Sequence, residues 1–173
     1  MKVKFIDKMG SDLSVVNAAR VSFSKTSEWE SITPAGPIEG LLSKQDEKLI
    51  NYLAKHNHWS PFGHASMQFH IKAPVFVARQ LVKHQVGLVW NEVSRRYVDD
   101  EVEFYVPEDW RGAPENSKQG SSSEVIDINP HHRMVDDYQQ VCKKAKWTYE
   151  HLLSQGVAPE QARMVLPQSM MTE

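Results

Sequence analysis

The segment RQLVKHQVGLVWNEVSRRY, residues 79–97, carries most of the candidate chemistry of this chain. Apolar residues at helical spacing predict a helix from Val75 to about Val86, which covers the first half of the segment. In such a helix Arg79 and Lys83 lie one turn apart, so their side chains are neighbours on one stripe of the surface. The first half is therefore expected to present positive charge from a rigid element.

The second half of the same segment is interpreted as extended, after a turn at Gly87. Glu92, Ser94 and Arg96 fall at a period of two residues, so a strand would point all three side chains to the same face. A carboxylate, a hydroxyl and a guanidinium would then meet the charged helix stripe in one space. Core segments rarely gather so many polar groups. The segment therefore predicts a binding site for a polar, anionic, planar ligand.

The composition is that of a soluble globular protein, because 40% of the 173 residues are apolar and 24% are charged. The length predicts one domain over residues 1–173. The formal net charge of −2 gives no overall attraction to nucleic acid or to an acidic membrane, and neither is expected as a partner. The positive charge is local to the segment above, which favours a small anion over a long polyanion.

Cys142 is the single cysteine of the chain, so no intrachain disulfide can form and a reducing, cytoplasmic location is expected. Val141 and Ala145 surround it on a helical pattern, which favours a small buried residue over a nucleophile. The N-terminal residues hold no apolar run long enough for a signal peptide. No later stretch is long enough to span a bilayer.

Helices and strands are expected to mix without the regular alternation of a parallel sheet. Strands are predicted over 2–7, 64–72 and 102–106, and helices over 12–21 (capped by Ser11 or Asp12), after a Ser43 cap, over 131–155 before Gly156, and from 159 to 167. Residues 24–42 and 111–130, rich in glycine, proline and hydroxyl side chains, are expected to be loops. The predicted class is α+β, a mixed or antiparallel sheet flanked by helices.

Other kinds of site receive less support from the sequence. Five histidines, at 56, 58, 64, 70 and 84, are predicted to fall on different elements without zinc-type spacing, so no metal is expected. The chain has neither a glycine-rich nucleotide motif nor a G-x-S-x-G nucleophile motif. Trp90 and Tyr97 beside Arg95 and Arg96 leave a nucleic-acid-binding module as a competing class.

Five blocks that occur in a fixed order give a more specific signal. They are AARVSF (18–23), HWSPFGH (58–64), KAPVFVARQ (72–80), NEVSRRY (91–97) and ARMVLP (162–167). Together they resemble the flavin-dependent thymidylate synthases over nearly the whole chain. The resemblance implies an α+β subunit that assembles into a homotetramer, with active sites at subunit junctions.

The activity implied by the resemblance is the reductive methylation of dUMP to dTMP. FAD is the implied cofactor, and NADPH and 5,10-methylenetetrahydrofolate are the implied co-substrates, so that cofactors carry the difficult steps. No enzyme nucleophile is then required, which agrees with the lack of an activated cysteine or serine. Two alternatives stay open: a degenerate or truncated paralogue that binds a pyrimidine nucleotide, and a related enzyme that places another group on C5 of such a nucleotide.

The roles of single residues follow from the matching positions of the family. The resemblance places Gln80, Glu92, Ser94, Arg95, Arg96 and Arg163 at dUMP, and Ser22, Ser60, Lys83, His84, Gln85 and Glu92 at FAD. Ser94, Arg96 and His58 are the implied catalytic residues, with His58 near the folate or flavin ring. Arg96 and Arg163 suit the recognition of phosphate or carbonyl oxygens, because a guanidinium can donate to two oxygens at once.

The chain departs from the family pattern in three places. Lys83-His84-Gln85 stands where Arg-His-Arg is usual, so Gln85 supplies no charge to a flavin phosphate. Val89 stands at a position that is often a small hydroxyl residue. The chain ends at Glu173, just after the RMVLP block, where family members continue with a helical region that adds flavin contacts and another arginine at the uracil. We therefore expect the chain to be a fragment of a longer product.

Overall fold

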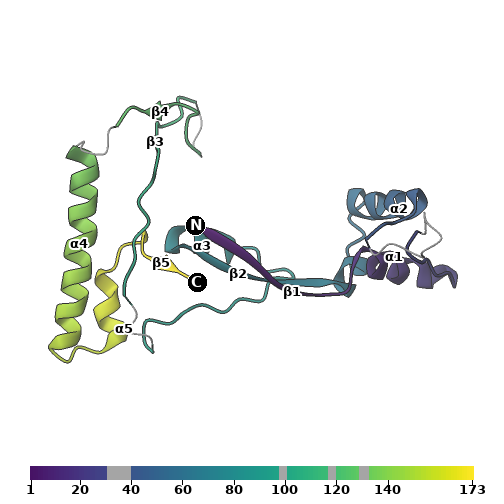
Figure 1. The fold of residues 1–173 in the computed structure, drawn as a ribbon, viewed down its shortest axis with the longest axis horizontal. Helices are drawn as coiled ribbons and strands as arrows, with labels where there is room; N and C mark the ends of the chain where they lie inside the picture. Colours follow the sequence, from purple (N-terminus) through teal and green to yellow (C-terminus); the bar gives the residue numbers. More distant parts are fainter. Residues whose placement is uncertain (31–39, 98–100, 117–119, 129–132) are drawn as a thin grey trace. The chain divides into compact units, whose positions relative to one another are not determined.

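The computed structural model describes residues 1–30, 40–97, 101–116, 120–128 and 133–173 (Figure 1). These residues form two compact units, one of residues 3–71 and one of residues 72–173 together with residues 1–2. Each unit combines helices with strands, and the α+β class predicted from the sequence is confirmed. That the whole chain makes a single domain stays a prediction.

The unit of residues 3–71 is built on two neighbouring strands, β1 (Lys2–Met9) and β2 (Ser66–Pro74). They lie side by side and run in opposite directions (Figure 1). The chain between them forms α1 (Asp12–Arg20), the 3-10 helix η1 (Val21–Phe23), α2 (Lys44–Lys55) and the 3-10 helix η2 (Ser60–His64). Both strands form where they were predicted, and each ends two residues beyond its predicted limit. The burial expected from their alternation is not observed, because Val3, Phe5, Met67 and Phe69 are exposed.

The turn between β1 and α1 requires glycine at residue 10. Gly10 has a φ of +77°, and a β-carbon there would lie 2.7 Å from the main-chain oxygen of His64 and 3.2 Å from the α-carbon of Ala65. A side chain at this position would force the backbone apart. The close approach therefore fixes the start of α1 against the end of η2.

The buried carboxylate of Asp46 joins α1 to α2, and this residue is only 2% exposed. Arg20 forms an ion pair with Asp46, and its Nε lies 3.0 Å from Oδ1. The hydroxyl of Ser27 donates to the same oxygen at 3.0 Å, and that of Ser43 donates to Oδ2 at 2.9 Å. Ser43 Oγ also accepts from the main-chain nitrogen of Asp46 at 3.2 Å, so the predicted cap of α2 is confirmed. Burial alone would raise the pKa of Asp46, but the donors from Arg20, Ser43 and Ser27 outweigh it and lower that pKa.

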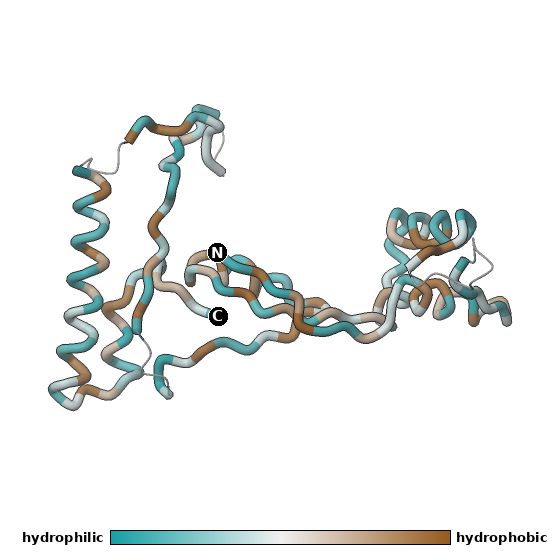
Figure 2. The backbone as a smooth tube through the Cα atoms, viewed as in Figure 1, coloured by the Kyte–Doolittle hydropathy of each residue, from teal (hydrophilic) through white to brown (hydrophobic). Residues whose placement is uncertain are grey.

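The longest helix of the unit of residues 72–173 is α4 (Arg133–Ser154). Its buried residues Val135, Cys142 and Tyr149 are spaced by seven, so they share one stripe of the helix. Figure 2 shows the matching alternation of hydrophobic and hydrophilic bands along α4. Gly156 follows with a φ of +81°, as predicted for the helix stop. The cysteine is buried as predicted, at 5% exposure.

Tyr149 packs with Val102 and Ala162 in the buried core of this unit. Ala162 ends α5 (Pro159–Ala162), which continues into the 3-10 helix η3 (Arg163–Val165). The short helix expected before Pro167 is thus confirmed. This core places α5 and η3 against α4, and so fixes the position of Arg163 relative to the rest of the unit.

A strand that the sequence did not predict, β5 (Met171–Thr172), pairs antiparallel with the end of β2. Ala73 lies opposite Thr172, and Pro74 lies opposite Met171. The sheet order is therefore β1-β2-β5. A strand of two residues has no alternation to reveal it, so only the non-local pairing defines it.

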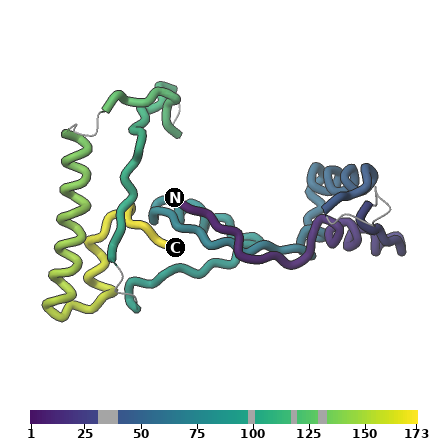
Figure 3. The backbone as a smooth tube through the Cα atoms, viewed as in Figure 1, coloured from purple at the N-terminus to yellow at the C-terminus, as the bar shows by residue number. Residues whose placement is uncertain are grey.

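Residues 102–106 were predicted to form a strand, and this prediction is wrong. Phe104 makes a single antiparallel bridge to Met170, and the main-chain nitrogen of Tyr105 donates to the oxygen of Ser169 at 2.8 Å. Figure 3 shows this segment passing beside the last residues of the chain, drawn in yellow. The apolar alternation here reflects packing against the core around Val102 instead of a continuous ladder.

The prediction of a loop over residues 111–130 missed a short antiparallel pair. β3 (Trp110–Arg111) lies at the start of this segment and pairs with β4 (Val125–Ile126). Parts of three predictions lie outside the described residues: positions 31–39 of the first loop, positions 117–119 and 129–130 of the second, and positions 131–132 of the long helix. Within the described ranges, no helix is at once long and apolar enough to cross a membrane.

Replacing Asp46 with asparagine is expected to destabilise the α1–α2 pair by about 2–3 kcal/mol at neutral pH, because Arg20 loses its buried partner. The folded-state pKa of Asp46 lies below its ordinary value of 3.8. Its contribution is therefore present above that value and is lost as the pH falls through the folded-state pKa. The measurement is the urea unfolding midpoint at pH 7 and under acid conditions.

Glu47→Gln is the matched control, because Glu47 is the exposed neighbour of Asp46 on the same helix. It should change the free energy of unfolding by no more than about 0.5 kcal/mol. An Asp46→Asn protein that keeps its midpoint at pH 7 would show that the buried ion pair contributes no net stability.

Candidate functional site

Helix α3 (Val75–Leu81) is shorter than predicted, since the helix was expected to continue to about Val86. Beyond its end the side chain of Val86 is 99% exposed and that of Val89 is 96% exposed. A short helix needs tertiary packing to persist, and these residues provide none. Gly87, with a φ of +73°, lies in a turn as predicted.

The segment around Ser94 is a turn, and the prediction of a strand through Glu92, Ser94 and Arg96 is wrong. The main-chain nitrogen of Tyr97 donates to the oxygen of Ser94 at 2.9 Å, which closes a four-residue turn. In a strand, Arg95 would point away from Arg96. In the turn, both arginines reach the same cavity.

That cavity has a volume of about 720 Å³ and lies within the unit of residues 72–173. Its walls come from α3, from residues 90–96, and from α5, η3 and the residues that follow. The polar side chains that line it are those of Arg79, Glu92, Ser94, Arg95, Arg96, Glu160, Arg163 and Gln168. Its volume is within the range of about 300–1,000 Å³ that is usual for ligand sites.

Positive charge dominates this cavity, since four arginines face two glutamates across its walls. Three separate elements supply the guanidinium groups: Arg79 comes from α3, Arg95 and Arg96 come from the turn, and Arg163 comes from η3. A guanidinium group can donate two parallel hydrogen bonds to two oxygens of a carboxylate or phosphate. The arrangement is therefore suited to an anionic ligand such as a phosphate ester.

Ser94 and Arg96 are arranged to serve one ligand. The hydroxyl oxygen of Ser94, Oγ, accepts from the main-chain nitrogen and from Nε of Arg96, each at 3.4 Å. A hydroxyl that accepts in this way keeps its own hydrogen for another acceptor. The guanidinium of Arg96 also lies 5.0 Å from the ring centre of Tyr97, which limits its freedom. The ligand therefore meets a hydroxyl donor beside an oriented cation.

The sequence-predicted substrate residues are mostly brought together. Glu92, Ser94, Arg95, Arg96 and Arg163 all line the cavity. Gln80 lies on α3 next to the lining residue Arg79, but its own side chain is exposed and is not part of the lining. Its role at dUMP stays a prediction.

The sequence-predicted flavin residues are not gathered into one cavity among the described residues. Lys83, His84 and Gln85 follow α3 and are exposed. Ser22 in η1 and Ser60 in η2 are exposed on the other unit. Glu92 is the one member of the set that lines the arginine-rich cavity. The flavin assignments therefore stay predictions.

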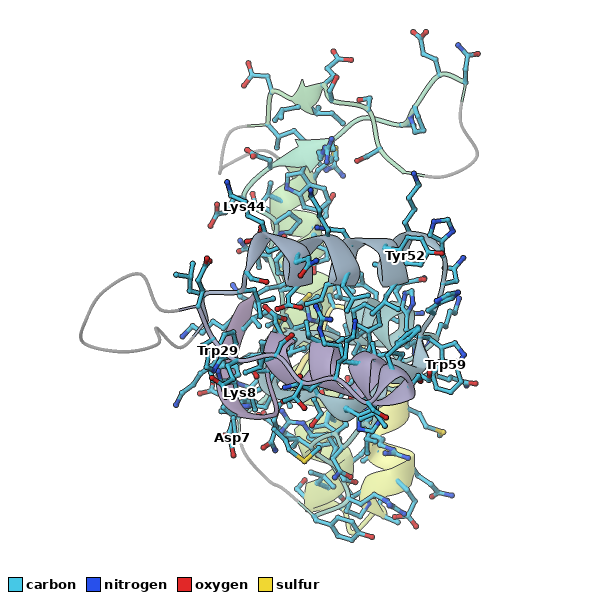
Figure 4. All side chains as sticks on the ribbon, turned by 90° about the vertical axis from the view of Figure 1, so that its right-hand side faces the viewer. Asp7, Lys8, Trp29, Lys44, Tyr52 and Trp59 are labelled. Carbon is cyan, nitrogen blue, oxygen red and sulfur yellow. The ribbon has the colours of Figure 1, made fainter. Side chains whose placement is uncertain are left out.

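His58 lies in an aromatic group at the end of α2, in the unit of residues 3–71. Its ring centre lies 5.9 Å from that of Tyr52 and 6.4 Å from that of His56, and Tyr52 and His56 are 4.3 Å apart. Figure 4 labels Tyr52 near this end of α2 and Trp59 close by on the same side. The exposed rings are available to contact a ligand or another chain.

Some lining residues were not part of the predicted site. Trp90, Glu160, Met164 and Gln168 line the cavity. Arg79 lines it too, as expected for the charged stripe, whereas its stripe neighbour Lys83 does not. Glu160 precedes Arg163 by three residues, so a shared helix face is the one signal that could have found it. In the part of the chain that the structure describes, no group of three or more histidine, cysteine or acidic side chains could hold a metal ion.

Fold and site thus define an α+β protein with an arginine-lined cavity whose charge suits an anionic ligand. Residues 4–173 match the family model described as thymidylate synthase complementing protein. A flavin-dependent thymidylate synthase of Kosmotoga olearia is 40% identical to this chain over 172 residues, covering 99% of the chain and 68% of that protein. One from Thermus thermophilus is 38% identical, covering 99% of the chain and 57% of that protein.

The chain is also similar to a solved structure. The UMP/dUMP methylase PolB of Streptomyces cacaoi, bound with 5-Br dUMP, matches with a TM-score of 0.72 at 36% identity, covering 99% of this chain and 69% of that one. The chain belongs to the flavin-dependent thymidylate synthases, a family of enzymes. It spans 57–68% of the length of the two relatives above.

Replacing Glu160 with glutamine is expected to tighten the binding of inorganic phosphate by about twofold to tenfold, because a carboxylate on the cavity wall repels the anion. Isothermal titration at low ionic strength measures the affinity, and the gain should shrink as salt is added. Glu150→Gln on α4, which is exposed and is not among the lining residues, is the matched control. Weaker phosphate binding by Glu160→Gln would mean that Glu160 orients an arginine instead of opposing the ligand.

Proposed function

We propose that this chain acts as a flavin-dependent thymidylate synthase, methylating dUMP to dTMP. 5,10-Methylenetetrahydrofolate is the proposed one-carbon donor, and FAD reduced by NADPH supplies the reducing equivalents. The family membership supports this proposal. The observation that carries it is the convergence of Ser94, Arg96 and Arg163, from two separate parts of the chain, on one cavity with excess positive charge.

In this proposal the cavity binds the nucleotide. Arg96 and Arg163 hold oxygens of the phosphate or of the uracil, because a guanidinium matches two oxygens in one plane. Ser94 donates its free hydroxyl hydrogen to the nucleotide, and Arg95 adds charge. Gln80 is proposed to contact the base from α3. These residues bind and orient the pyrimidine, so that C5 faces the reacting partners.

The proposed flavin site uses side chains whose donor set fits a dinucleotide. Lys83, His84 and Gln85 are consecutive and exposed, and they offer a cation, an imidazole and an amide to phosphate oxygens. Ser22 and Ser60 are proposed to add hydroxyl donors, and Glu92 to lie between nucleotide and flavin. His58 is proposed to lie near the folate or flavin ring.

A second candidate is a related enzyme that acts on a different pyrimidine nucleotide. It is favoured by the similarity to PolB, a protein described as a UMP/dUMP methylase and also solved with 5-Br UMP, at a TM-score of 0.71 and 31% identity. UMP differs from dUMP by one 2′-hydroxyl, so parallel titrations with the two nucleotides separate the candidates. Tighter binding of UMP than of dUMP would favour this second activity.

We further propose that the chain works as a homotetramer. Its support is the exposure of apolar side chains on both strands of the unit of residues 3–71: Val3 is 67% exposed, Phe5 51%, Met67 68% and Phe69 45%. Phe5 and Phe69 contact each other edge to face, with ring centres 5.9 Å apart. An apolar patch of this kind is typical of an interface between chains.

A cytoplasmic location is proposed from the single, buried cysteine.

The function is tested by the binding of dUMP to the FAD-loaded protein, measured by isothermal titration and by the change in visible flavin absorbance. Arg96→Ala is expected to weaken dUMP binding by about 10–100-fold, the usual loss when a charged hydrogen-bond partner is removed. Unchanged dUMP affinity in Arg96→Ala would contradict the role of this residue.

Arg133→Ala is the matched control, because Arg133 is 92% exposed on α4 and pairs only loosely with Asp137, at 3.7 Å. It should bind dUMP like the unaltered chain. A chain that takes up no dUMP, with or without FAD, would contradict the proposed function itself.

Phe5→Asp is expected to shift the protein toward smaller species, because a buried, unpaired carboxylate at an apolar interface costs several kcal/mol. Sedimentation velocity over a range of concentrations measures the effect. The control is Lys4→Asp, which places the same charge on the neighbouring residue of β1, where a charged side chain already stands. Equal sedimentation of all three proteins would show that this strand pair lies outside the interface.

A further inference from the structure

The carboxylate of Glu92 is held from outside the cavity. The hydroxyl of Thr172 donates to Oε1 of Glu92 at 2.6 Å, a short charge-assisted hydrogen bond. The main-chain nitrogen of the next residue, Val93, donates to the main-chain oxygen of Glu173 at 2.9 Å. Two consecutive residues of the cavity wall are thus tied to two consecutive residues of the chain around β5.

The tie matters because residues 91–97 belong to no helix or strand. β5 itself is firmly placed, since it pairs with Ala73 and Pro74, of which Ala73 is only 4% exposed. Thr172 therefore connects an irregular segment to a rigid one. Its branched side chain has few rotamers, which makes it a better anchor than a long flexible donor.

Glu92 needs such an anchor because it shares the cavity with arginines. A carboxylate that is free to rotate would pair with a guanidinium of Arg96 or Arg163, and the pair would compete with an anionic ligand. A carboxylate that accepts from Thr172 has one oxygen occupied and its direction set. Arg96 and Arg163 then remain available to the ligand.

We infer that Thr172 is a positioning residue: its hydroxyl holds Glu92 away from the arginines and so prepares the cavity for the nucleotide. The inference rests on the proposed function in naming dUMP as that nucleotide. Thr172 acts through Glu92, and its own contact with the ligand is not required.

Thr172→Val and Thr172→Ser test the inference, because valine keeps the shape without the hydroxyl and serine keeps the hydroxyl. In the free protein, Thr172→Val is expected to speed amide hydrogen exchange in the peptide of residues 91–97, whereas Thr172→Ser is not. Thr172→Val is also expected to weaken dUMP binding about tenfold, and Thr172→Ser about twofold or less. The thermal midpoint measured beside each variant separates local from global loosening.

Thr148→Val is the matched control, since the hydroxyl of Thr148 donates within α4 to the oxygen of Lys144 at 2.8 Å. The inference is overturned if Thr172→Val matches the unaltered chain in exchange and affinity, or if Thr172→Ser is as weak as Thr172→Val. If the unaltered chain binds no dUMP, the proposed function fails, and the exchange comparison alone still decides whether Thr172 orders the cavity wall.

Discussion

Two main-chain donors at the start of α3 impose the constraint on which the cavity depends. The main-chain N–H groups of Val75 and Phe76 have no acceptor within the helix, because they lie in its first turn. Pro74, the N-cap residue, provides no side-chain acceptor. They donate instead to the oxygens of Met170 and Gln168, at 2.9 and 3.1 Å. These two hydrogen bonds satisfy donors that have no partner within the helix, and they hold residues 168–170 beside the start of α3.

These hydrogen bonds bring the walls of the cavity together. Residues 168–170 follow η3 after only two residues, so holding them at α3 brings Arg163 and Arg79 to the same space. The main-chain oxygen of Ser169 also accepts from the main-chain nitrogen of Tyr105. This hydrogen bond ties residues 168–170 to the segment whose Phe104 packs against the core. A site for an anion thus depends on satisfying the ordinary hydrogen-bonding groups of a short helix.

Sequence reasoning found the chemistry of the site better than its geometry. The polar character of Glu92, Ser94 and Arg96 predicted that they share one site, because charged groups seldom cluster without a function, and all three line the same cavity. Their period of two suggested a strand, yet the described residues of this segment form no ladder, and a turn closed by Ser94 and Tyr97 follows instead. The same kind of error extended α3 past Leu81, where exposed valines give the helix nothing to pack against.

The features that could not be predicted from the sequence are mostly contacts between distant parts of the chain. β5 and the bridge between Phe104 and Met170 depend on partners about 65–100 residues away, and no local pattern encodes them. Glu160 was not among the predicted site residues, and the fold places it on the cavity wall. The five ordered blocks identified the family without indicating any of these contacts.

The exposed apolar strands have a consequence for the chain inside a cell. In the proposed assembly Phe5 and Met67, which are exposed in the single chain, become buried only when a second copy binds. The free energy of unfolding of each subunit would then increase with the total concentration of the chain. A small pool of newly made chains would spend longer with these side chains in water, within reach of chaperones and proteases. The amount of working protein would then rise more steeply than the rate of its synthesis.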